Sequence, residues 1–296
     1  MDLNAVTEFA PATSDGAWRD GDAWLGGGTW LFSQAQPRVR RLLDLSAFGW
    51  PPLTETDGGL TIAATCTLAE LARWRPARPR YGNAAALARQ CCDALLGSFK
   101  VQNVATVGGN ICLSLPAGPM TALAAALDGV AALAPPDGGE TRQVAVADFV
   151  TGDGRNVLRP GELLTRVEIP AAALTARTAF RQLSLSPVGR SAVLVIARRD
   201  TAGDTAGSTI VTVTASTPRP LTLRFPSPPG QDDAVSALDQ AAPEYLDDVH
   251  GSRPWRAAMT RRAVLEVTAD VAADVAADAA ADVAADVAAE AEEHRQ

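Results

Sequence analysis

Histidine is almost absent from this chain of 296 residues, which contains only His250 and His294. Acid–base, triad and metal chemistry that depends on imidazole is therefore not predicted. The four cysteines show no CxxC spacing: Cys66, Cys91, Cys92 and Cys112. Such cysteines are typical of small buried side chains, so we predict neither a zinc site nor an iron–sulfur cluster in this chain. If the chain belongs to an enzyme, we expect a cofactor to carry the difficult chemical step.

Long hydrophobic runs and an excess of positive charge are also missing. The longest apolar stretch, residues 121–134, is interrupted by Asp128 and falls short of the roughly 20 residues that cross a bilayer. The first residues, Met1-Asp2-Leu3-Asn4, do not have the pattern of a cleaved signal peptide, so we expect a cytoplasmic protein without a membrane span. The net charge is -8, and no nucleic-acid partner is predicted because such a partner needs a basic face.

Short apolar runs separated by turn residues predict an α+β protein. Helices are expected where the pattern lengthens, and Glu70 lies three residues after Thr67 as in a capping box. The expected strands are 23–25, 42–45, 60–64, 130–133 and 163–169, and the expected helices are 67–72, 83–98 and 119–127. Pro170 then closes a first domain, residues 1–170, with subdomains of about 1–55 and 56–170.

The remainder of the chain predicts a smaller domain and a tail. Residues 171–267 form the smaller α+β domain, with strands expected at 179–185, 191–197 and 210–215 and a helix from 253 to about 267. Residues 268–296 repeat V-A-A-D, and eight acidic residues stand against Arg295 alone from Asp270 onward. Alanine favours a helix while aspartates four residues apart repel each other, so we expect a frayed helix or a disordered tail. A solvated extension is the favoured role of this tail, and a docking segment is the alternative.

Three consecutive glycines, Gly26, Gly27 and Gly28, follow an expected strand and precede Thr29. Glycine permits positive φ and exposes backbone N–H groups, which is how a pyrophosphate is often held. A tight turn uses the same residues, so both interpretations stay open for this run alone. The run is no dinucleotide-binding GxGxxG motif, because Leu31 takes the place of the last glycine, and no Gly-Lys-Thr or Gly-Lys-Ser follows.

A second glycine pair, Gly108 and Gly109, lies between Thr106 and Asn110. Its backbone donors and two polar side chains suit the other side of one anionic ligand. A β-turn is the alternative for this pair as well. Two such loops about 80 residues apart favour one shared ligand site.

The two loops together resemble a known family. The first loop is similar to the AGGTxL loop, and residues 103–111, which read NVATVGGNI, are similar to the NVATIGGNI signature of the FAD-binding subunit of molybdenum hydroxylases. That family includes the xanthine dehydrogenase and carbon monoxide dehydrogenase types. Residues 60–71, 163–170, Phe180-Arg181 and Trp255-Arg256 also resemble family segments, so the resemblance covers nearly residues 1–267.

The resemblance implies a fold of the FAD-binding PCMH type, like vanillyl-alcohol oxidase and MurB, in which two α+β subdomains precede a smaller α+β domain of the carbon monoxide dehydrogenase flavoprotein type. FAD would be held between the glycine loops, with Leu164 and Arg181 near the flavin. No catalytic side chain and no metal ligand are implied. The implied cofactor-binding residues are Gly26, Gly27, Gly28, Thr29, Trp30, Leu31, Thr106, Gly108, Gly109, Asn110, Leu164 and Arg181.

The implied function is electron transfer. Electrons would pass from iron–sulfur centres of a partner through FAD to NAD, a quinone or oxygen. Molybdopterin would lie on a large partner subunit and the [2Fe-2S] clusters on a small one.

Two departures from the family pattern bear on FAD binding. Pro119 stands where the family commonly has an aspartate near the ribose, so that hydrogen bond is lost or is supplied by Ser114 or the backbone. Trp30 stands where an acidic residue is frequent. They motivate one alternative, a flavin-free scaffold subunit of the same complex. A stand-alone flavin oxidoreductase is a further alternative, although no constellation for substrate protonation is visible.

Overall fold

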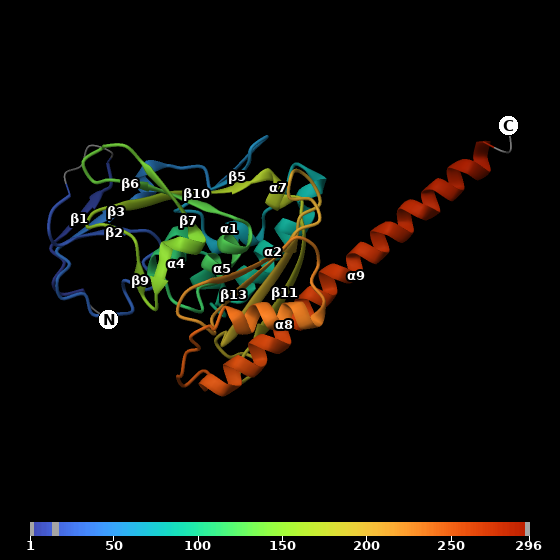
Figure 1. Ribbon diagram of the computed structural model, residues 1–296. Coiled ribbons are helices and arrows are strands. Elements are labelled where there is room, and N and C mark those ends of the chain that lie inside the picture. The colour runs from blue at the N-terminus through green and yellow to red at the C-terminus, as the bar shows by residue number, and fades with distance from the viewer. Residues whose placement is uncertain (1–2, 14–17, 294–296) are drawn as a thin grey trace.

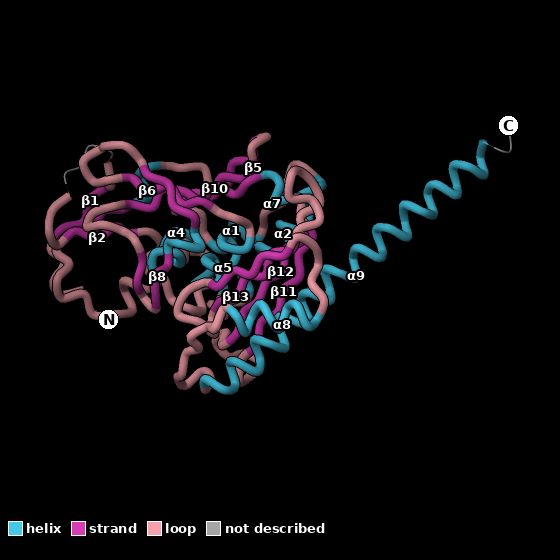
Figure 2. The backbone as a smooth tube through the Cα atoms, in the orientation of Figure 1, coloured by secondary structure: helices cyan, strands magenta, loops and turns pink. Residues whose placement is uncertain are grey.

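The structure, a computed structural model, describes residues 3–13 and 18–293, and for residues 274–293 it describes the backbone alone. Its elements form layers: a five-stranded sheet, a layer of helices, a four-stranded sheet, and two further helices outside that second sheet (Figure 1). A three-stranded sheet lies at the N-terminal end of the molecule (Figure 2). The α+β class expected from the sequence is confirmed.

The N-terminal sheet is parallel and has the order β1-β3-β2. Its strands are β1 (Glu8–Pro11), β3 (Arg41–Asp44) and β2 (Asp22–Leu25), and the short helix η1 (Leu45–Phe48) follows β3. The apolar pair Leu42 and Leu43 is buried in the central strand. Because β2 ends at Leu25, the glycine run leaves the sheet edge directly as a loop.

The five-stranded sheet is antiparallel and has the order β4-β5-β10-β6-β7. Its strands are β4 (Leu53–Thr56), β5 (Gly59–Ala63), β10 (Leu163–Pro170), β6 (Val130–Ala134) and β7 (Arg142–Ala145). After β7 come α6 (Val146–Phe149) and a two-stranded ribbon of β8 (Val150–Gly152) and β9 (Arg155–Asn156). The central strand β10 buries Leu164, Val167 and Ile169 in the main core.

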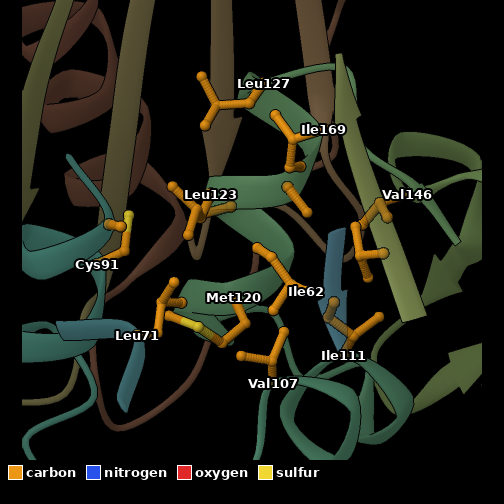
Figure 3. Packing of buried hydrophobic residues seen from close by; sticks show 14 of the residues in the cluster. Ile62, Leu71, Cys91, Val107, Ile111, Met120, Leu123, Leu127, Val146 and Ile169 are labelled. Carbon is orange, nitrogen blue, oxygen red and sulfur yellow. The ribbon is translucent and has the colours of Figure 1, made fainter. Parts of the chain in front are cut away.

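Helices fill the space behind this sheet: α1 (Leu68–Ala72), η2 (Pro79–Tyr81), α2 (Gly82–Asp93), α3 (Phe99–Gln102), α4 (Val107–Leu113) and α5 (Pro119–Ala126). The predicted capping box of α1 is confirmed, since the Thr67 hydroxyl accepts from Glu70 N and the Glu70 carboxylate accepts from Thr67 N. Every residue of α5 is buried. Figure 3 shows Met120, Leu123 and Leu127 among the packed side chains of the core.

The second sheet is antiparallel, in the order β11-β12-β13-β14. Its strands are β11 (Arg177–Leu183), β12 (Val193–Arg199), β13 (Thr209–Thr214) and β14 (Leu221–Phe225), preceded by α7 (Ala171–Leu174) and followed by α8 (Gln231–Gln240) and α9 (Arg253–Glu293). In β12, Leu194 and Ile196 join the main core, while Val193 and Val195 pack with buried residues of α9. The main core thus continues past residue 170, and the domain boundary there remains a prediction.

Two helices differ from their expected lengths. The helix expected over residues 83–98 ends at Asp93, because Leu96 takes φ 54° and a separate turn, α3, begins after Gly97. The helix expected to end near Val267 continues to Glu293, so α9 leaves the body as one long helix (Figure 1). The role expected of the tail, a solvated extension or a docking segment, stays a prediction. No helix in the described part of the chain is long and apolar enough to cross a membrane.

Candidate functional site

The first glycine loop lies directly against the second one. A Cβ atom added to Gly27 would stand 1.5 Å from the carbonyl oxygen of Val104, and one added to Gly26 would stand 3.0 Å from the Thr106 hydroxyl. Gly28 has φ +69°, which a residue with a side chain adopts only at a cost. The absence of side chains is therefore what lets two segments distant in sequence touch.

The amide groups of residues 26–31 have no acceptor within the described part of the chain. Two carbonyl oxygens of this loop do accept hydrogen bonds: Phe32 N donates to Gly28 O at 2.9 Å, and Ser33 N donates to Trp30 O at 2.9 Å. A row of unpaired N–H groups is costly unless water or a ligand accepts from them. This loop offers the donors that an anionic ligand needs.

The second glycine pair forms the first turn of α4. Gly108 N donates to Ala64 O at 3.0 Å, and Gly109 N donates to the Thr106 hydroxyl at 3.1 Å. The two amides that we expected to face a ligand are thus engaged within the chain. What this segment offers a ligand is polar side chains: the hydroxyl of Thr106 and the amide of Asn110, whose Oδ1 already accepts from Met120 N at 3.0 Å.

A cavity of about 540 Å³ opens between these segments. Its walls are mostly apolar side chains and loop backbone, and no acidic side chain lines it among the described residues. A volume of this size suits a ligand with a large aromatic portion. Of the predicted site residues, those that line it are Gly26, Gly27, Gly28, Thr29, Trp30, Leu31, Thr106, Gly109 and Asn110.

Three predicted site residues lie elsewhere. Gly108 lies behind the loop, where an added Cβ would stand 2.6 Å from the Ala64 Cβ. Leu164 is buried in the main core. Arg181 forms ion pairs with Glu266 and Asp270 of α9, each at 2.8 Å. None of the three lines the cavity, so their contacts with FAD remain predictions.

The two departures from the family pattern differ in where they lie: Trp30 lines the cavity, whereas neither Pro119 nor Ser114 does. Pro119 is buried at the start of α5, and Ser114 is fully buried and does not line the cavity. The Ser114 hydroxyl donates to Ile111 O at 3.0 Å and accepts from Asn156 Nδ2 at 3.0 Å. Trp30 does line the cavity, with 42% of its surface exposed.

The cavity also has residues that the sequence did not single out. The end of α2 and the segment after it contribute one wall, the loop before α5 another, and the hairpin between β11 and β12 a third. These residues include Ala94, Leu95, Gly97, Val101, Leu115, Ala117, Gly118, Arg190 and Ser191. Arg190 and Ser191 carry no local motif, and only the layering of β12 over the helices brings them here.

One cysteine lines the cavity. Burial raises the pKa of Cys112 to about 12, so its thiol stays protonated at neutral pH. The same cause raises the pKa of Cys66 and of Cys92 to about 12. Nucleophilic or electron-carrying thiolate chemistry therefore has no support at this site.

Fold and site together define an α+β protein with a mostly apolar cavity between two glycine loops, the first of which offers backbone donors suited to an anionic ligand. Residues 9–172, more than half of the chain, match the family described as the FAD binding domain in molybdopterin dehydrogenase. The chain belongs to this family, which confirms the resemblance seen in the sequence.

Known proteins resemble this chain in part of its sequence or in its fold. The nicotinate dehydrogenase FAD-subunit of Eubacterium barkeri is 34% identical over 92 residues, an alignment that spans 30% of this chain and 30% of that protein. Among solved structures, carbon monoxide dehydrogenase from Hydrogenophaga pseudoflava matches with a TM-score of 0.74 at 20% identity over 92% of this chain and 99% of that one. Quinoline 2-oxidoreductase from Pseudomonas putida 86 matches with a TM-score of 0.70 at 21% identity, over the same shares. The fold class predicted from the sequence is confirmed.

Proposed function

We propose that this chain is the FAD-carrying electron-transfer subunit of a molybdenum hydroxylase complex. FAD, when bound, supplies the capacity to take up and release two electrons. The amides of residues 26–31 carry the proposal, because they have no acceptor among the described residues and these residues line the 540 Å³ cavity. They offer backbone donors of the kind that bind a pyrophosphate.

The residues present fit this cofactor. The first loop holds the pyrophosphate with backbone N–H groups, while Thr106 and Asn110 add side-chain donors from the opposite side. The apolar walls contributed by Leu95, Val101 and Leu113 exclude water from a flat ring system. Trp30 at the loop offers an aromatic face for a second ring.

Electron relay, rather than substrate conversion, is the role proposed for this chain. In this scheme the [2Fe-2S] clusters of a small partner subunit deliver electrons that originate at molybdopterin on a large subunit. NAD, a quinone or oxygen then receives the electrons. The presence of a nicotinate dehydrogenase FAD-subunit among the relatives supports a division of such complexes into separate chains.

Titration of the purified chain with FAD tests the proposal. Saturable, one-to-one binding with quenching of flavin fluorescence is the expected result, and the complex isolated with its partners should contain one FAD per copy of this chain. A complex that assembles without flavin, from a chain that ignores added FAD, would instead support the flavin-free scaffold. Turnover of a small substrate by the isolated chain would support a stand-alone oxidoreductase.

A further inference from the structure

Arg190 is the only residue with a charged side chain among the described residues that line the cavity. It lies in the hairpin between β11 and β12, outside the residues 9–172 that match the FAD-binding family. No hydrogen bond or ion pair joins its guanidinium to another residue of the described chain. Most other arginines here have carboxylate partners, as Arg181 does with Glu266.

The base of this hairpin is firmly held. Arg256, which is 1% exposed, donates to Ala192 O at 2.6 Å and to Ala215 O at 2.7 Å. Next to Arg190, the Ser191 hydroxyl accepts from Gln182 Nε2 at 2.9 Å. These bonds hold the backbone directly after Arg190, so the hairpin that carries this residue is anchored beside the cavity.

Arg190 is exposed where it lines the cavity, and a guanidinium without a carboxylate partner there favours an anionic ligand. The first glycine loop supplies donors without net charge, and no carboxylate lining the cavity offsets Arg190 among the described residues. The pyrophosphate of FAD carries two negative charges, and an arginine can bind two of its oxygens at once. We propose that Arg190 binds the FAD pyrophosphate, as a counter-charge that the C-terminal half of the chain supplies to the site. This inference rests on the proposed function, because it assumes that FAD is the ligand.

Binding of FAD and of ADP to the full-length apoprotein tests the proposal. ADP carries the diphosphate without the flavin and is measured as a competitor of FAD. We expect Arg190→Gln to raise the Kd of both ligands by a similar factor, about 10- to 100-fold, and to weaken the salt dependence of binding. Arg190→Lys should recover part of the loss, since it keeps the charge without the planar fork.

Arg219→Gln is the matched control. Arg219 lies in the hairpin between β13 and β14, at the same end of the same sheet, and it does not line the cavity. Its replacement removes the same charge, and we expect a Kd within about threefold of the wild type. Unchanged thermal unfolding of both variants would show that the difference does not come from folding.

Three outcomes would overturn the inference. FAD binding by Arg190→Gln equal to that of the control would show that Arg190 does not contact the ligand, while leaving the proposed function intact. A loss of FAD affinity without a loss of ADP affinity would place Arg190 at the flavin instead of the pyrophosphate. A wild-type chain that binds neither ligand would refute both the inference and the proposed function.

Discussion

Gly27→Ala perturbs the contact between the two loops more directly than any other single change. An added Cβ would stand 1.5 Å from Val104 O, whereas ordinary contact begins near 3.4 Å, so the loops would have to separate by about 2 Å. The atoms that the added Cβ would meet belong to the backbone of Val104 and Ala105, so they cannot move aside as a flexible side chain could. We expect the first loop to be displaced from the cavity while the distant core keeps its packing.

The expected loss of FAD affinity follows from the backbone N–H donors that the displaced loop can no longer offer the phosphate. Each amide that bonds a charged phosphate oxygen contributes about 1.5–3 kcal/mol. That corresponds to roughly a 10- to 150-fold change in Kd for each bond lost. A hydrogen bond needs a donor–acceptor distance of about 2.9 Å, so a shift of about 2 Å breaks it. We therefore expect FAD affinity to fall by at least one such factor.

Fluorescence titration of the apoprotein with FAD measures this loss. Gly82→Ala is the matched control, because no atom lies within 4 Å of the added Cβ and the position begins α2. Alanine favours a helix, so the control should bind FAD normally and unfold at the same or a slightly higher temperature. Gly27→Ala with wild-type affinity would refute the argument that loop contact shapes the site.

Two further predictions concern stability. Arg256→Met removes the donor that bonds the carbonyl oxygens of Ala192 and Ala215. The free energy of unfolding, measured in urea, should therefore fall by about 3–5 kcal/mol. Arg253→Met is the control at an exposed position and should change that free energy by less than about 1 kcal/mol. The hydrogen bonds from Arg142 lower the pKa of Glu162 below its usual value of 4.5. The pair therefore stabilises the folded state fully above pH 4.5, and this stabilisation is lost as the pH falls through the pKa of Glu162 in the folded state. Arg142→Gln should therefore lower stability at pH 7 by on the order of 2 kcal/mol and reduce the change in stability between pH 5 and about pH 3. Equal pH profiles for the variant and the wild type would contradict this assignment.

Local pattern was enough to predict much of the first half. The expected strand at residues 60–64 and the helix after Thr67 depend on turn residues and a capping box, which act over a few positions. The glycine run was also readable, because only glycine tolerates φ +69° at Gly28 and the close approach at Gly27. These signals lie in neighbouring residues, so the sequence displays them directly.

Other features depended on long-range packing. The amide of Gly108 is paired because Ala64, from a distant part of the chain, lies beside it. Arg181 forms ion pairs with α9 rather than lining the cavity. Such partners are distant in sequence, so composition and periodicity contain no record of them.

By itself, the sequence determined that the chain is an α+β flavoprotein of the molybdenum hydroxylase family, because its two glycine motifs require particular residues at particular places. The tertiary structure alone decided which groups surround the cavity. Within the part of the chain that the structure describes, it leaves the amides of residues 26–31 without an acceptor, engages the amide of Gly108 with Ala64, and brings Arg190 to the cavity from another sheet. The reason is physical: a motif specifies the conformation of its own backbone, whereas the charge and the donors of a cavity depend on which distant segments pack around it.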